Sequence, residues 1–128
     1  MLKEEYRKLR NEVNYQLLTY RRNLERLSGH GLTDGEREML TGWCEVIARV
    51  YGGLKKSDRE KARAMVRLFG LYAPVPRYKG TMQRILRLTI EFNVSESTLY
   101  RWRSEIIQMT MLAAMEAGLF HTHGKSEQ

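Results

Sequence analysis

Apolar residues recur at every third or fourth position along the first part of the chain, between residues 2 and 27. They are Leu2, Tyr6, Leu9, Val13, Leu17, Tyr20, Leu24 and Leu27. This spacing places them on one narrow seam of a helix, and an unbroken helix over these residues would be about 39 Å long. A narrow seam is typical of a helix that packs against one partner helix. The run Gly29-His30-Gly31 is predicted to end this helix.

Two capping boxes predict the starts of the next two helices. Thr33 precedes Glu36 by three residues, and Ser57 precedes Glu60 by the same spacing. An apolar helical stripe follows each box. The first stripe is Met39, Leu40, Trp43, Val46, Ile47, Val50 and Tyr51, and the second is Ala62, Met65, Val66 and Phe69. The pair Gly52-Gly53 is predicted to end the first of these helices.

The last part of the chain predicts two more helices. Both prolines fall in a predicted loop over residues 70–80. A shorter helix is predicted from Thr81 to Phe92, and a long one from a cap at Ser95 to about residue 117. Gly118 then occupies the position of a left-handed C-terminal cap.

The pattern as a whole predicts an all-α fold, because no segment alternates polar and apolar residues as a strand does. A chain of 128 residues fits one domain, or one domain with an arm. We expect residues 1–31 to form a long N-terminal amphipathic helix and residues 32–120 to form a helical domain. Residues 121–128 are predicted to be a disordered tail.

The segment around Asn93 has the features of a helix-turn-helix, predicted at about residues 81–104. The sharp turn of this motif needs a residue that tolerates a left-handed backbone, and Asn is the best choice after Gly. Six apolar residues flank the turn at offsets that let the two helices pack. They are Ile85, Leu88 and Phe92 before the turn, and Val94, Leu99 and Trp102 after it. The motif predicts that residues 32–120 bind DNA with the helix over 95–104 in the major groove.

The other side of that second helix would face the DNA. Arg101 is the main candidate for base reading, since Arg binds guanine through two hydrogen bonds. Hydroxyl and aromatic side chains on the same turns are further candidates, namely Ser95, Ser97, Thr98, Tyr100 and Ser104. Candidates for contacts with the flanking backbone are Arg77, Lys79, Arg84, Arg87 and Arg103.

The charge distribution agrees with this interpretation. The chain has a net charge of +7 and a pI near 9.8. Residues 77–103 hold six basic and two acidic side chains. Their net charge of +4 is more than half of the net charge of the chain. Beyond Arg103 only Lys125 is basic. A basic surface of this kind is the electrostatic requirement for binding a polyanion such as double-stranded DNA.

The sequence shows few features of membrane proteins, enzymes or metal-binding proteins. No apolar run approaches the ~20 residues that cross a bilayer, so we expect a cytoplasmic protein without a membrane partner. The single cysteine, Cys44, is expected to be a small buried hydrophobic residue. No catalytic set or phosphate-binding glycine loop is evident, so no enzyme, cofactor or metal is predicted. His121 and His123 are expected to belong to the tail.

A family resemblance adds to this picture. The segment Val94–Arg103, followed by Glu105-Ile106-Ile107, resembles the C-terminal end of bacteriophage transcriptional regulators of the RinA and ArpU type, whose DNA-binding part is similar to region 4 of sigma factors. The resemblance covers about half of the chain. It implies a phage or prophage activator of late genes that contacts DNA and RNA polymerase. By resemblance the DNA contacts are Ser95, Ser97, Thr98, Tyr100 and Arg101, with Leu99 and Trp102 in the core. Thr89 departs from the family pattern, in which Ala is usual.

Two alternatives stay open at this level. A phage small terminase subunit would also bind DNA, although such proteins usually carry the reading helices at the N-terminus. A helical protein-interaction module would use the first helix for docking and the basic surface for solubility. The long last helix is apolar on more than one side, so it is either the central core helix or a homo-oligomer interface in which methionines supply an adaptable surface. We expect a homo-oligomer.

Overall fold

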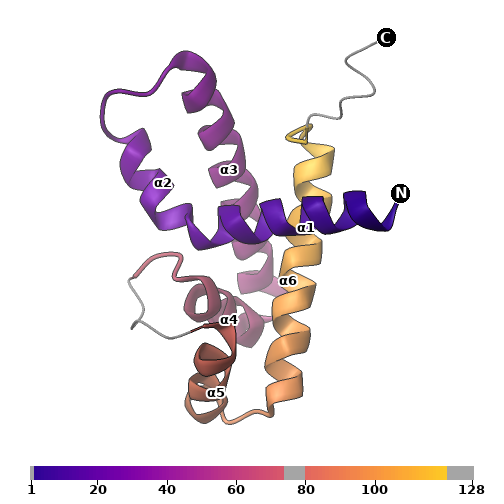
Figure 1. Ribbon diagram of the computed structural model, residues 1–128. Helices are drawn as coiled ribbons and strands as arrows, with labels where there is room; N and C mark the ends of the chain where they lie inside the picture. Colours follow the sequence, from indigo (N-terminus) through magenta and orange to yellow (C-terminus); the bar gives the residue numbers. More distant parts are fainter. Residues whose placement is uncertain (1, 74–79, 121–128) are drawn as a thin grey trace.

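The computed structural model describes residues 2–73 and 80–120, and the predicted backbone contacts Arg77 and Lys79 and the tail 121–128 lie outside these residues. The described residues form six α-helices and no strand (Figure 1), which confirms the all-α fold. The helices are α1 (Lys3–Leu18), α2 (Tyr20–Leu27), α3 (Asp34–Ser57), α4 (Arg59–Phe69), α5 (Thr81–Phe92) and α6 (Glu96–Glu116).

Helix α6 is the central element, and it packs against α1, α3, α4 and α5. Its inner side is buried along its whole length, through Leu99, Trp102, Ile106, Ile107, Thr110, Met111 and Ala114. Burying one large aliphatic side chain contributes about 1.5–3 kcal/mol. The sequence left two roles open for this helix, and the structure confirms that it is the core helix.

The N-terminal helix is not continuous, and this part of the sequence prediction was wrong. The seam over residues 2–27 divides at Thr19, where the backbone leaves helical geometry (φ −104°, ψ 6°). The Thr19 hydroxyl donates to the carbonyl of Tyr15 at 2.8 Å, a bond within the turn that bends helices. It also accepts from Asn23 Nδ2 at 3.2 Å. The break lets α1 cross α6 while α2 packs against α3.

Helix α3 runs through Gly52-Gly53 to Ser57, so these glycines do not end it as predicted. Continuing the helix buries Leu54 in the core, which outweighs the roughly 1 kcal/mol helix penalty of each glycine. The next cap is also displaced by one residue, because Asp58 and not Ser57 accepts from the Lys61 N–H. The box at Thr33 and Glu36 is confirmed with both of its hydrogen bonds, at 3.1 and 2.9 Å.

The turn between α5 and α6 has the predicted backbone. Asn93 adopts the left-handed conformation (φ 55°, ψ 48°), and among the described residues it is the one non-glycine position with positive φ. The N–H groups of Asn93 and Val94 both donate to the carbonyl of Thr89, which closes the end of α5. Ser95 then caps α6, and Gly118 takes the predicted left-handed conformation beyond its other end (φ 73°).

Substitution at Asn93 tests the turn. We expect Asn93→Ala to lower the free energy of unfolding by about 1–2 kcal/mol, because a Cβ without a local hydrogen-bonding group disfavours this backbone. Asn93→Gly is the matched control, since glycine adopts the left-handed conformation without strain. Urea unfolding measures both variants. Equal stability of the two would contradict a strained turn at this position.

Candidate nucleic-acid interface

Apolar packing fixes the angle between α5 and α6. Ile85, Leu88 and Phe92 from α5 are buried, as are Leu99 and Trp102 from α6. The rings of Phe92 and Trp102 meet edge to face with their centroids 6.5 Å apart, a favourable aromatic geometry. Val94 is half-buried beside them. Five of the six predicted flanking residues are therefore buried, in agreement with the predicted packing of the two helices.

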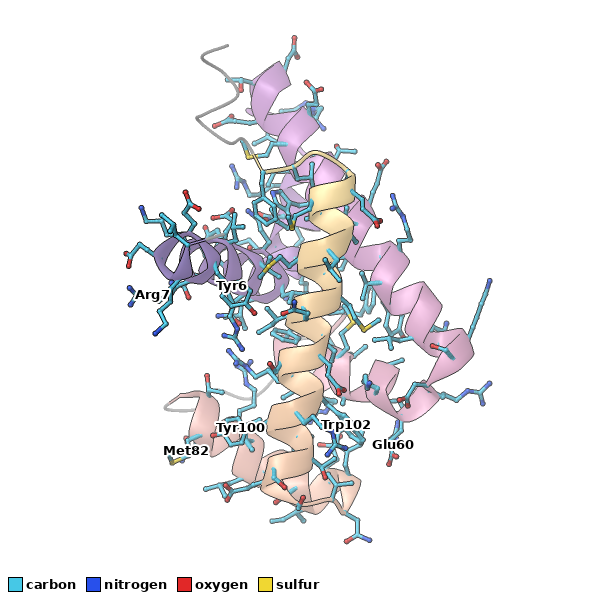
Figure 2. The ribbon with its side chains drawn as sticks, turned by 90° about the vertical axis from the view of Figure 1, so that its right-hand side faces the viewer. Tyr6, Arg7, Glu60, Met82, Tyr100 and Trp102 are labelled. Carbon is cyan, nitrogen blue, oxygen red and sulfur yellow. The ribbon has the colours of Figure 1, made fainter. Side chains whose placement is uncertain are left out.

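The outer side of the first turns of α6 lies open to solvent. Arg101 has 60% of its side chain exposed, although it follows a Tyr and precedes the buried Trp102. The structure thus places the side chains of Arg101 and Trp102 on different sides of α6. The other exposed candidates on these turns are Ser95, Ser97, Tyr100 and Ser104, with Thr98 half-buried. Figure 2 shows Tyr100 and Trp102 on opposite flanks of α6.

Three hydroxyl groups meet at the N-terminus of α6. Ser95 Oγ accepts the backbone N–H of Thr98 at 3.2 Å. The same atom lies 3.1 Å from Ser97 Oγ and 3.0 Å from Thr98 Oγ1. The first N–H groups of a helix carry a partial positive charge. Ser95 is committed to the cap by this arrangement, so Ser97 and Thr98 are the better placed to meet an anion.

The Arg101 guanidinium has an acidic neighbour within reach. Its Nε lies 3.9 Å from Glu105 Oε2, one turn further along α6. Glu105 also pairs with Lys61 of α4 at 2.8 Å. An exposed pair at the longer distance contributes little, in the range of about 0–1 kcal/mol. The shorter pair therefore holds Glu105, and Arg101 can leave it at small cost.

Two of the predicted phosphate contacts have partners inside the fold. Arg84 donates to the carbonyl of Leu68 at 2.6 Å, at the C-terminal end of α4. Arg103 donates to Asn14 Oδ1 at 3.0 Å and so joins α6 to α1. Burial, and next the positive charge of Arg10, lower the pKa of Arg103. Arg87 is exposed on the outer side of α5.

Two surface features were missed by sequence reasoning. Met82, Leu86 and Ile90 form an exposed apolar stripe along α5, with Ile90 80% exposed. The spacing of four residues could have shown that these residues share a face. It could not have shown that this face is left uncovered by the other described helices. The second feature is a basic stripe on α1, formed by Lys3, Arg7 and Arg10. Its residues lie beside the apolar seam of the same helix.

Features of other functional classes are few in the part of the chain that the structure describes. No group of three or more His, Cys, Asp or Glu side chains is placed to bind a metal ion there. No helix among these residues is long and apolar enough to cross a bilayer. Cys44 is buried as predicted, and this burial raises the pKa of its thiol.

Comparison with protein families, with curated proteins and with solved structures finds no match to this chain. The likeness to the RinA and ArpU type regulators therefore depends on the residues of this sequence alone, and it stays a prediction.

Substitutions of Ser95, the N-cap of α6, test the stability of the fold and DNA binding separately. We expect Ser95→Ala to lower the free energy of unfolding by about 1 kcal/mol, because the Thr98 N–H loses its acceptor. Ser95→Asp restores an acceptor and should retain the stability, yet it places a negative charge where a phosphate would approach. Thermal unfolding and DNA binding of both variants check this. Equal destabilisation by Ala and Asp would contradict the capping role.

Proposed function

We propose that this protein is a sequence-specific DNA-binding transcriptional regulator that inserts the first turns of α6 into the major groove. One observation carries the proposal: the left-handed turn at Asn93 seals Trp102 against Phe92 while Arg101 extends into solvent. A reading helix needs both properties, a fixed inner side and a free donor-rich outer side. The net charge of +7 supplies attraction to the polyanion.

The outer side of α6 offers the chemistry for reading bases. Arg101 carries the planar fork of donors that matches the O6 and N7 acceptors of guanine. Ser97 and Ser104, one turn to each side, hold hydroxyl groups that donate or accept. Tyr100 is exposed beside them. The helix N-terminus directs its partial positive charge toward the same region. Activation through RNA polymerase, the phage origin and the homo-oligomer stay predictions.

Binding across a salt series tests the proposal. The full chain should bind a random-sequence duplex at 50 mM salt, and the logarithm of its affinity should fall steeply and linearly with the logarithm of salt concentration. Fluorescence anisotropy with a labelled duplex measures both quantities. An absence of binding at 50 mM salt would reject a DNA-binding function and would favour a protein-interaction module.

Arg101 separates base reading from phosphate contact. We first expect selection from a random duplex pool to yield a preferred sequence. Arg101→Ala should then weaken binding to that sequence by about 1–3 kcal/mol and relax the preference at one base pair. Arg101→Lys keeps the charge but loses the planar fork, so it should relax the same base pair while binding random DNA like the wild type.

An equal loss on preferred and random DNA for Arg101→Ala would show that Arg101 contacts phosphate. Lys61 still pairs with Glu105 in both variants, so neither substitution leaves this carboxylate without a cation. Thermal unfolding should be close to that of the wild type for both.

A further inference from the structure

Helix α1 crosses α6 and contacts it through residues of both its halves. Val13 and Leu17 are fully buried and anchor the second half of the helix. The Tyr6 hydroxyl donates to Gln108 Oε1 of α6 at 2.9 Å, and Arg103 of α6 donates to Asn14. Beyond this crossing the N-terminal end of α1 extends past α6 (Figure 1). A surface helix fixed at two points in this way can present its side chains in a constant geometry.

One face of this helix is basic. Lys3, Arg7 and Arg10 follow one another at intervals of four and three residues, so they share a face. A shallow groove runs along them and is lined by Lys3, Tyr6, Arg7, Arg10 and Asn11. Arg7 pairs with Glu4 at 2.6 Å, but both side chains are about two-thirds exposed. Solvent screens such a pair, so little free energy is lost when another anion replaces Glu4 as the partner of Arg7.

The basic face of α1 lies next to α6, the proposed reading helix. Asn14, one turn beyond Arg10, accepts from Arg103 of α6. Arg10 lies close enough to Arg103 for their positive charges to repel, which helps to lower the pKa of Arg103. Figure 2 shows Arg7 and Tyr100 on the same side of α6, with α1 above the turns that carry Tyr100. An anion in this corner would relieve the repulsion between these cations.

We propose that Lys3, Arg7 and Arg10 form a second contact surface that binds backbone phosphates of the DNA duplex read by α6. This inference rests on the proposed function. Lys3 and Arg10 are seven residue steps apart, or about 10 Å along the helix. Three cations at this spacing can meet phosphates of one DNA strand, and such contacts contribute affinity without sequence preference.

The salt dependence of binding tests this surface. The first variant combines Lys3→Ala, Arg7→Ala and Arg10→Ala. The matched control combines Lys8→Ala, Arg22→Ala and Arg49→Ala, which removes the same charge from exposed positions on another face of α1 and on α2 and α3. A lost phosphate contact lowers the slope of log affinity against log salt by about 0.9. We expect the first variant to lose about 2–3 in slope on random duplex, and the control less than 1.

A second variant distinguishes a lost phosphate contact from a loss of stability. Arg10 is half-buried, whereas Lys3 and Arg7 are exposed. Lys3→Ala combined with Arg7→Ala should therefore melt like the wild type and still reduce the slope by about 1.8. The base preference found by selection should be the same as that of the wild type, since phosphate contacts carry no direct sequence information.

The outcomes separate the two proposals. If the wild type binds DNA and the stripe variants have the same slope as the control, the α1 surface is wrong while the reading helix stands. A changed base preference in the stripe variants would also contradict a phosphate contact. If the wild type fails to bind at 50 mM salt, both proposals are wrong, and α1 is then better explained as a surface for a protein partner.

Discussion

The backbone reversal at Asn93 is the constraint on which the proposed interface depends. A left-handed residue at this position lets α5 end and α6 begin within three residues. The reversal brings Phe92 against Trp102 and so orients the inner side of α6. Once that side is set, helical geometry places Arg101 on the outer side without any further interaction. A single backbone conformation thus determines which side chains of α6 reach solvent.

Helix α6 combines two roles that make different demands. Its inner side is part of the hydrophobic core over the whole length of the helix, and it packs against four other helices. Its first turns nevertheless present a polar outer side that carries both Arg101 and Glu96. Core packing makes α6 rigid, and rigidity lowers the entropic cost of ordering side chains on a DNA surface. The Lys61–Glu105 pair adds a link to α4 close to the reading turns.

The cations of this protein divide between structural and exposed roles. Arg67 of α4 binds Glu91 of α5 with two hydrogen bonds at 2.8 and 2.9 Å, which ties the helices before the turn. Arg84 and Arg103 also hydrogen-bond to neighbouring helices. Net charge alone therefore overstates the surface available to DNA. The exposed cations with weak or distant acidic partners, such as Arg101 and Arg7, are the ones whose geometry suits an external anion.

The features that depend on neighbours within about four residues could be predicted from the sequence. The capping box at Thr33, the cap at Ser95 and the left-handed turn at Asn93 are local, because backbone sterics and short hydrogen bonds decide them. The buried register around Trp102 followed from helical periodicity. The same reasoning failed at Thr19 and at Gly52-Gly53, where local propensity and packing compete. The outcome at those positions depends on the whole fold, because the contacts of α1 with α6 and the burial of Leu54 join residues far apart in the chain. Tertiary packing also determines that Arg84 and Arg103 have partners inside the fold while Arg101 does not face the core, since the free energy of a side chain depends on neighbours that periodicity does not specify.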